Sequence, residues 1–126
     1  TFGGNPLAMR SANAVLELLL EEGFLNQLKK MIVYFDYKMD ELIKIDNQKS
    51  PLLIIKKKGS GMLRGFELSE NITAADFGNI ARNKGLLLVG AAENTIRLLP
   101  PLNTSKEEIN NAFHVLNEVL LEIKKN

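Results

Sequence analysis

The chain has 126 residues, of which 45% are hydrophobic and 25% charged, a balance that fits a globular domain and excludes a disordered chain. Its formal net charge of +1 gives no electrostatic reason to expect nucleic acid or a membrane surface as a partner. It has no cysteine, so disulfides and thiolate metal sites are excluded, which suits a cytoplasmic protein. The longest apolar runs, such as Leu18–Leu20 and Leu86–Val89, are too short to span a bilayer.

The chain begins with the loop TFGGNPLA, which predicts the start of a helix. Pro6 suits the first helical position, because the N–H that it lacks is unpaired there in any helix, and Asn5 can act as the N-cap. Gly3 and Gly4 allow backbone conformations that a Cβ would forbid. A helical apolar pattern then continues from Leu7 to Glu22.

A second helix is predicted from Phe24 to Ile45, after Gly23, which suits the position just beyond a helix end. The polar residues 46–50 and Pro51 then predict a loop. One stripe of apolar residues spaced three and four apart supports this helix: Leu25, Leu28, Ile32, Phe35, Met39 and Leu42.

Two short strands are expected next, Leu52–Lys56 and Met62–Leu68, joined in antiparallel fashion around the turn Gly59-Ser60-Gly61. The basic run Lys56-Lys57-Lys58 is typical of a solvated strand end. A helix from Ile72 to Lys84 follows.

The pattern then predicts a buried strand, Leu86–Val89, a loop of small residues, 90–94, and a strand, Thr95–Leu99, that ends at two prolines. The last helix begins at a capping box, with Thr104 or Ser105 as the cap and a glutamate three residues further on. These elements predict an α+β fold, in which a small, mostly antiparallel sheet is covered by helices.

The sequence offers no catalytic set of its own. His114, the single histidine, has no evident colleague, so we interpret it as a structural residue of the last helix. No spacing typical of metal ligands or of a nucleophile with its base is present. The turn Gly59-Ser60-Gly61 is not followed by a helix, so it does not match a phosphate-binding loop.

Two places could bind an anion. In the opening loop, Thr1 supplies a hydroxyl and the glycines supply amides ahead of a helix N-terminus, although an ordinary capped helix start would look the same. Arg97 lies between apolar residues of a strand and needs a partner there, because an unpaired buried guanidinium is costly. Its planar fork matches a carboxylate, which could be a ligand or the side chain of Glu93.

Three stretches at these places, TFGGNPLA, GSGMLRGFEL and NTIRLLPPL, resemble the C-terminal part of the class III (ornithine-type) aminotransferases, which depend on pyridoxal 5'-phosphate. They occur in the family's order, and the stretch LLLVGAAENTIRLLPPL is most similar to the acetylornithine type. The resemblance implies that residues 1–22 are a loop and connecting helix from a large cofactor domain absent from this sequence. It also implies that residues 23–126 are the C-terminal small domain of a fold-type I enzyme.

For single residues the resemblance implies limited roles. Thr1 matches the threonine that reaches the cofactor phosphate of the neighbouring subunit in a homodimer, and Gly3, Gly4 and Asn5 match the loop that supports this contact. Arg97 matches the arginine that binds the substrate carboxylate, or that in some relatives pairs with a glutamate of the large domain. Arg64 falls at a variable position of the family and is assigned no role.

The function implied is transfer of an amino group from N-acetylornithine to 2-oxoglutarate in arginine biosynthesis, with succinyldiaminopimelate of lysine biosynthesis as a further donor. The Schiff-base lysine lies upstream in such enzymes, so these 126 residues are expected to be inactive alone. Alternatives are an aminotransferase for ornithine, 4-aminobutyrate or another omega-amino acid. From another class, a free-standing α+β module that binds an anion also fits the residue pattern.

Overall fold

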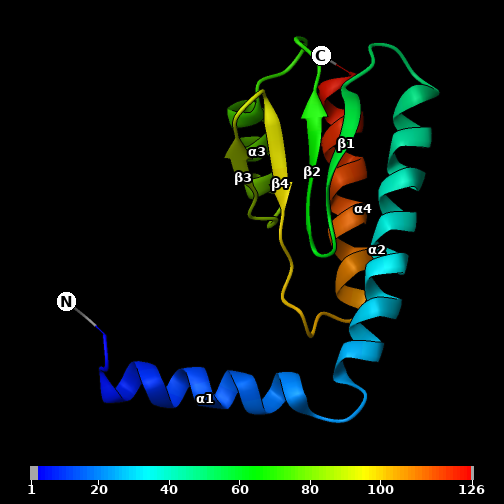
Figure 1. Ribbon diagram of the computed structural model, residues 1–126. Helices are drawn as coiled ribbons and strands as arrows, with labels where there is room; N and C mark the ends of the chain where they lie inside the picture. Colours follow the sequence, from blue (N-terminus) through cyan, green and yellow to red (C-terminus); the bar gives the residue numbers. More distant parts are fainter. Residues whose placement is uncertain (1–2, 126) are drawn as a thin grey trace. The chain divides into compact units, whose positions relative to one another are not determined.

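The computed structural model describes residues 3–125. The chain divides into two compact units, Thr1–Lys30 and Met31–Asn126. Whether a domain boundary lies near residue 23, as the resemblance implies, stays a prediction. The described part contains four helices and four strands (Figure 1). In chain order these are α1 (Pro6–Leu20), α2 (Phe24–Asn47), β1 (Ile54–Ser60), β2 (Leu63–Leu68), α3 (Ala74–Asn83), β3 (Val89–Ala91), β4 (Thr95–Leu98) and α4 (Lys106–Ile123).

In the first unit, α1 begins as the sequence predicts. Pro6 is at the start of the helix, and Asn5 Oδ1 accepts hydrogen bonds from the amides of Leu7 at 2.9 Å and Ala8 at 3.3 Å. Gly23 has a φ of +86°, a left-handed conformation that glycine adopts without strain, just before α2 begins. From Pro6 to Leu20 no residue is buried, and all of the apolar side chains of α1 except the intermediate Leu19 are exposed.

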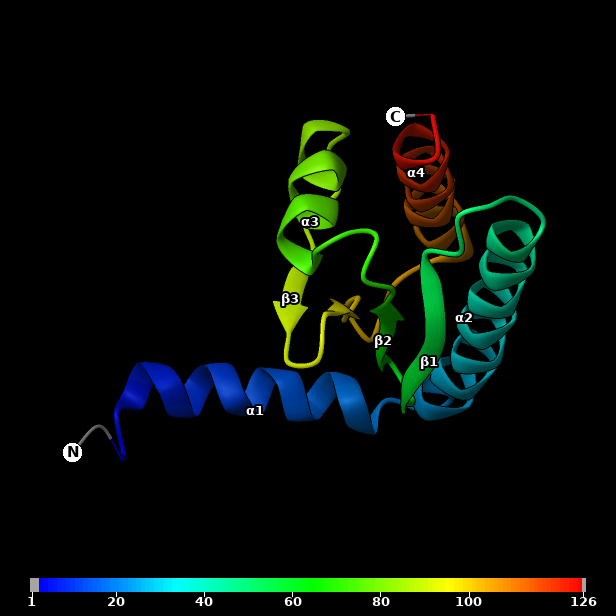
Figure 2. The ribbon, with the colours of Figure 1, turned by 90° about the horizontal axis from the view of Figure 1, so that it is seen from above.

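The second unit is a two-layer α+β structure, as the sequence predicts. The sheet is antiparallel throughout, in the order β1-β2-β4-β3. The part of α2 after Met31, together with α3 and α4, lies on one face of this sheet, the inner face (Figure 2). Among residues 31–125 no element covers the other face, which we call the outer face (Figure 2).

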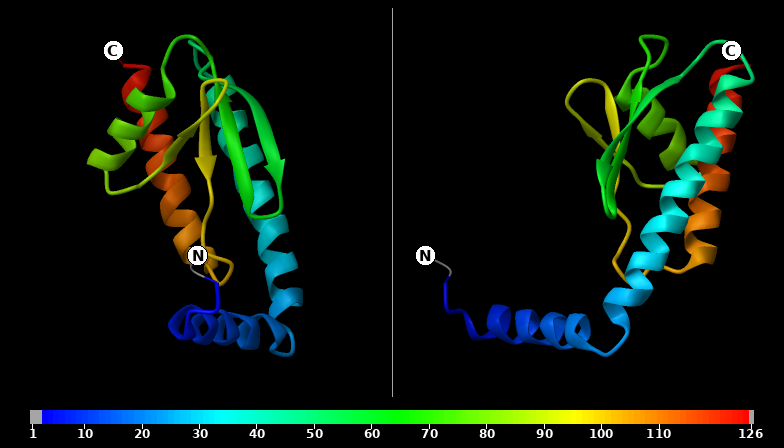
Figure 3. Two further views of the ribbon diagram at one scale, coloured as in Figure 1. Left: turned by 60° about the vertical axis from the view of Figure 1, so that its left-hand side comes forward. Right: turned by 45° about the vertical axis from the view of Figure 1, so that its right-hand side comes forward.

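The core lies between the inner face and the helices. Phe66 of β2 and Ile96 of β4 are opposite each other in the register and are buried. The helices α2 and α4 run side by side (Figures 1 and 3), and Phe35 meets Phe113 edge-to-face with ring centroids 5.8 Å apart. The apolar stripe predicted for α2 is confirmed in its second half, where Phe35, Met39 and Leu42 are buried.

The first strand, expected over Leu52–Lys56, is observed as β1 from Ile54 to Ser60, so Gly59 and Ser60 belong to the strand rather than to the turn. Two further predicted boundaries are wrong. Leu86–Val89 is not a buried strand: β3 begins only at Val89, which is 59% exposed, and Leu87 is 79% exposed. Only Val89 of this run belongs to β3, an edge strand that pairs only with β4, and residues 86–88 precede the strand. The second error is the loop predicted from residue 46, since α2 continues to Asn47.

Asp46 is the reason that α2 extends. Its carboxylate is buried, and Oδ2 accepts hydrogen bonds from the amides of Leu53 at 3.0 Å and Ile54 at 2.8 Å. Lys124 Nζ lies 2.7 Å from Asp46 Oδ1 as an ion pair, although the angle does not satisfy that of a hydrogen bond. The same ammonium donates to the carbonyls of Asp46 and Lys49. This cluster ties the end of α2, the start of β1 and the end of α4 together.

The capping box of α4 is confirmed, with Ser105 as the cap and Glu108 as its partner. The amide and hydroxyl of Ser105 donate to the Glu108 carboxylate, which lowers the pKa of Glu108 below its usual 4.5. A carboxyl group with a lowered pKa stabilises the folded chain at pH values above its unfolded pKa, and that stabilisation is lost as the pH falls through the folded value.

We therefore expect the difference in urea midpoint between the wild-type chain and Glu108→Gln to shrink as the pH is lowered from about 7 to about 3. Parallel urea titrations of the 126-residue chain would measure it. Glu107→Gln, in the same helical turn but outside the box, is the matched control and should move the midpoint less. A constant difference across this pH range would contradict the role of the Glu108 charge.

Candidate functional site

Arg97 lies on the outer face of the sheet. The side chains of a strand alternate between the two faces, and in β4 the buried Ile96 and Leu98 face the core while Arg97 is exposed. Between residues 3 and 125, no side chain forms an ion pair with the Arg97 guanidinium. The expectation that Arg97 is buried is therefore wrong, and its cation is accessible to a ligand or to another part of the protein.

The ion pair considered between Arg97 and Glu93 does not form. Glu93 instead pairs with Lys58, which also lies 2.8 Å from a carboxylate oxygen of Glu67. These two carboxylates raise the pKa of Lys58, Glu67 contributing most, and Lys58 lowers the pKa of Glu93. The nearest predicted counter-ion of Arg97 is thus already engaged with a lysine.

The neighbours of Arg97 leave its side chain open. In the register it lies opposite Gly65 of β2 on one side and Val89 of β3 on the other. A Cβ at Gly65 would come within 2.9 Å of the Ile96 carbonyl oxygen and of a Thr95 methyl, so only glycine allows the two strands to approach this closely. Leu99, which follows β4, is 63% exposed. The Arg97 guanidinium therefore lies among exposed apolar side chains and is open to a ligand or to another polypeptide.

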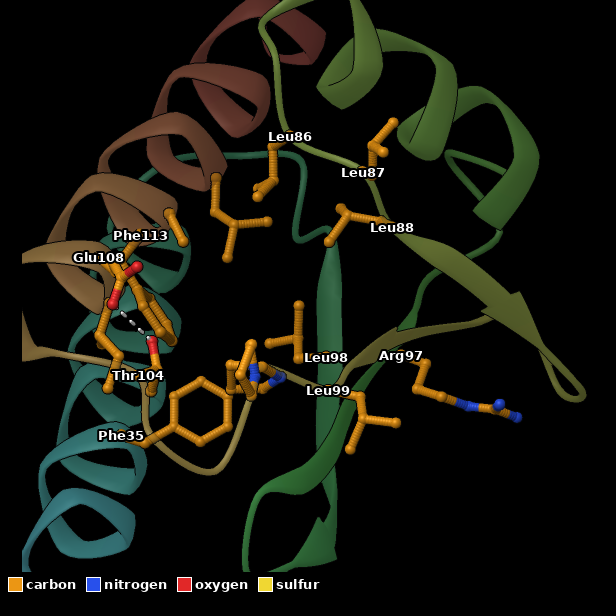
Figure 4. A pocket seen from close by; sticks show the side chains of 15 residues that line it. Phe35, Leu86, Leu87, Leu88, Arg97, Leu98, Leu99, Thr104, Glu108 and Phe113 are labelled. Carbon is orange, nitrogen blue, oxygen red and sulfur yellow. Dashed lines mark hydrogen bonds between the residues drawn. The ribbon is translucent and has the colours of Figure 1, made fainter. Parts of the chain in front are cut away.

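A cavity that Arg97 and its strand line in part lies on the inner side of the sheet (Figure 4). It has a volume of about 310 Å³ and lies between β4, the chain leading into β3, and α4. Its walls are mainly apolar, with Leu86, Leu98 and Phe113 among them, and the Arg97 guanidinium points away from it. The cavity therefore offers no partner to the carboxylate that Arg97 could bind.

The second candidate, the opening loop, is described from Gly3 onward, and Thr1 lies outside the described residues. Gly3 and Gly4 are exposed, and a Cβ at either would meet no atom within 4 Å. Asn5 already occupies the first free amides of α1, those of Leu7 and Ala8. An anion bound here would consequently depend on the loop ahead of the helix rather than on the helix N-terminus.

Lysines and the histidine do not add a catalytic group. Of the basic run, Lys56 is exposed as predicted, but the other two lysines form ion pairs. Lys57 reaches Asp36 at 3.0 Å and Asp40 at 2.6 Å on α2, while Lys58 points to the outer face. Desolvation by burial is the largest single influence on the pKa of Lys57 and lowers it, but the two aspartates together raise that pKa above its ordinary value, so the amine stays protonated. His114 is exposed, 3.5 Å from Glu118.

Sequence reasoning missed two residues that organise the sheet. Arg64 NH2 lies 2.7 Å from Asp36 of α2, and its other nitrogens donate to the carbonyls of Gly59 and Gly61 in the β1–β2 hairpin. Asn94 joins the β3–β4 turn to the chain before α3. The sequence signal for Asn94 is its residue type, because asparagine tolerates the left-handed backbone that it adopts in this turn.

In residues 3–125 no helix combines the length and apolar character needed to cross a membrane. The same residues contain no cluster of three or more histidine or carboxylate side chains that could hold a metal ion.

Comparison with known proteins places this chain in a family. Residues 1–120 match the family model described as aminotransferase class-III. Acetylornithine aminotransferase 2 of Caulobacter vibrioides is 37% identical over 118 residues, covering 94% of this chain and 28% of the relative. Ornithine aminotransferase of an Exiguobacterium species is 39% identical over 120 residues, covering 95% of this chain and 28% of the relative.

Solved structures agree with the sequence comparison. Acetylornithine aminotransferase from Elizabethkingia anophelis superposes with a TM-score of 0.80 at 30% identity, covering 97% of this chain and 30% of that one. The chain thus spans less than a third of the length of the relatives that it matches. Over the portion that it spans, it belongs to the class-III aminotransferase family.

Proposed function

We propose that this chain is the C-terminal part of a pyridoxal-phosphate-dependent aminotransferase that transfers an amino group from N-acetylornithine to 2-oxoglutarate. The proposal places the enzyme in arginine biosynthesis in the cytoplasm, with succinyldiaminopimelate as a further donor. Its support is the match of residues 1–120 to the aminotransferase family, and the names of relatives such as the acetylornithine aminotransferases of Caulobacter vibrioides and Elizabethkingia anophelis.

The observation that carries the proposal within the chain is the exposed Arg97 on the outer face. The guanidinium has planar donors that bind a carboxylate in bidentate fashion, and the acceptor 2-oxoglutarate carries two carboxylates. In this proposal Arg97 binds and orients the substrate carboxylate, and it takes no part in proton transfer. Because no side chain of residues 3–125 pairs with it, substrate binding would not have to break an ion pair within this part of the chain.

The opening loop fits the phosphate of the cofactor, because exposed Gly3 and Gly4 leave room for an anion to approach the backbone. Pyridoxal 5'-phosphate supplies the group that accepts the amine and the ring that delocalises the electrons. In the proposal, the Thr1 hydroxyl donates a hydrogen bond to the cofactor phosphate in the neighbouring subunit of a homodimer. Asn5 supports the loop by fixing the start of α1. The 126 residues would then contribute one contact to the cofactor's phosphate across the dimer and would not catalyse the reaction alone.

The proposal is tested by purifying the full-length enzyme and measuring consumption of 2-oxoglutarate with a panel of amino donors. We expect a visible absorption band from the bound cofactor and the highest kcat/KM with N-acetylornithine. A protein without that band, or one that forms no glutamate with any donor, would contradict the aminotransferase proposal.

A second donor deserves a place in this panel. The Exiguobacterium relative, which is as similar to this chain as the acetylornithine enzymes, is named an ornithine aminotransferase. If ornithine gives the highest kcat/KM, the proposal changes in its donor and keeps its reaction class.

The role of Thr1 leads to a separate expected result. In the full-length enzyme, Thr1→Ala should weaken retention of the cofactor by roughly ten- to a hundredfold, since one hydrogen bond to a charged group contributes about 1.5–3 kcal/mol. Equilibrium dialysis against pyridoxal 5'-phosphate would measure the loss, with Thr1→Ser as the matched variant that keeps the hydroxyl. Equal affinity of the wild type and Thr1→Ala would contradict the phosphate contact.

A further inference from the structure

The turn between β3 and β4 leads directly into the strand that carries Arg97. Ala91 is opposite Thr95 in the register, so the loop consists of Ala92, Glu93 and Asn94. Two of these residues have positive φ, +57° at Glu93 and +48° at Asn94. That is the left-handed region, which asparagine occupies far more readily than most residues with a Cβ.

Both polar atoms of the Asn94 side chain form hydrogen bonds with the backbone of one neighbouring segment, residues 68–74. Its Nδ2 donates to the carbonyls of Ser69 at 3.0 Å and Ile72 at 2.9 Å, with a longer contact of 3.4 Å to that of Leu68. Its Oδ1 accepts from the amide of Ala74, the first residue of α3, at 2.7 Å. The backbone contributes as well, because the carbonyl of Asn94 accepts from the amide of Leu68 at 2.9 Å.

Few side chains could replace this set of interactions. Glycine adopts the left-handed backbone but makes none of the side-chain hydrogen bonds. Aspartate could accept from Ala74 but has no donors for the carbonyls, against which its charge would be repelled. The asparagine amide supplies both the donors and the acceptor in a conformation that it tolerates.

The register of β4 decides which face Arg97 occupies. Strand side chains alternate with a period of two, so a shift of one residue would move Arg97 to the inner face and Ile96 or Leu98 to the outer face. Only the three-residue turn separates β4 from the edge strand β3, and Asn94 fixes that turn to the segment from Leu68 to Ala74. The start of β4 is therefore set by Asn94.

We propose that Asn94 is a positioning residue for substrate binding: its amide holds the β3–β4 turn, and thereby the register of β4, so that the Arg97 guanidinium projects from the outer face toward the substrate carboxylate. This inference rests on the proposed function, in which Arg97 binds that carboxylate. Asn94 itself does not contact the substrate.

The test uses Asn94→Gly in the full-length enzyme, because glycine keeps the left-handed backbone and removes only the side-chain hydrogen bonds. We expect KM for 2-oxoglutarate to rise roughly tenfold, with a smaller change in kcat, since displacement of a positioning group by about 1 Å is enough for such losses. Asn83→Gly is the control: Asn83 is exposed at the end of α3 and lies outside both the turn and the segment from Leu68 to Ala74. It should leave this KM unchanged.

A double-mutant cycle separates positioning from general destabilisation. If Asn94 acts through Arg97, then adding Asn94→Gly to Arg97→Lys should raise KM little beyond the value of Arg97→Lys alone. Fully multiplicative effects on KM, or an unchanged KM in Asn94→Gly, would overturn the proposal.

A second measurement keeps the inference testable if the role of Arg97 itself fails. Glu67 and Thr95 are opposite each other in the register, so cysteines at these two positions should form a disulfide when β2 and β4 are paired as observed. The two cysteines are introduced in the full-length enzyme, in which these 126 residues contribute no other cysteine. Mass mapping of the linked peptides identifies the bond. We expect this disulfide to form less completely in Asn94→Gly. Equal yields with and without Asn94→Gly would show that Asn94 does not set the register, whatever Arg97 binds.

Discussion

Arg97→Lys in the full-length enzyme is expected to raise KM for 2-oxoglutarate by roughly ten- to a hundredfold. A lysine keeps the charge but replaces two parallel hydrogen bonds with a point charge, and one hydrogen bond to a charged group contributes about 1.5–3 kcal/mol. The exposed position of Arg97 means that the substitution disturbs no core packing, so the loss should appear in substrate binding. Steady-state kinetics with 2-oxoglutarate as the varied substrate would measure it.

Arg82→Lys provides the matched control for this substitution. Arg82 is exposed on α3, outside β4, and the same chemical change there should leave KM within about twofold of the wild type, as is usual for surface substitutions. An unchanged KM in Arg97→Lys would assign Arg97 a structural role and remove the main observation behind the substrate proposal.

The largest effect on stability is expected at the buried ion pair of Asp46 and Lys124. The side chain of Asp46 is fully buried and that of Lys124 is 6% exposed. Lys124→Met would leave a carboxylate buried without its cation, and breaking a buried pair in this way usually costs about 3–5 kcal/mol of the free energy of unfolding. Urea unfolding of the 126-residue chain would report this cost as a lower midpoint.

Two variants make the interpretation specific. Lys125→Met changes the neighbouring, exposed lysine and should alter the free energy of unfolding by less than about 0.5 kcal/mol. Adding Asp46→Asn to Lys124→Met should recover part of the loss, because asparagine keeps an oxygen for the amides of Leu53 and Ile54 and leaves no buried charge. If Lys124→Met is as stable as Lys125→Met, the pair does not fasten α2 to α4.

The apolar side chains of α1 are the other large exposed feature. Between Pro6 and Leu20 none of the residues is buried, and Leu7 and Leu20 are 77% and 80% exposed. Exposed apolar residues in such number are typical of a surface that another polypeptide covers. This agrees with the proposal that these residues belong to a longer homodimeric enzyme, whose relatives are more than three times as long as the portion matched.

Local signals in the sequence determined the elements. Caps depend on a few adjacent residues, so Asn5 and Ser105 were correctly assigned as a cap and a capping candidate, and the antiparallel hairpin followed from its glycines. The family was also within reach of the sequence, because its motifs are short continuous stretches. The apolar stripe of the second helix gave the core side of α2 in its second half, where Phe35, Met39 and Leu42 are buried.

Only the tertiary structure decided which residues face outward and which partners they find. An apolar run such as Leu86–Val89 reads the same whether it forms a buried strand or not, and in the structure only Val89 belongs to the edge strand β3. Asp46 looked like a loop residue because its partner Lys124 is 78 residues away in the sequence. Arg97 looked buried because its neighbours along the strand are apolar, but those neighbours point to the opposite face. Pairing between distant residues and the choice of face are set when the sheet and helices pack together, and no local pattern contains that information.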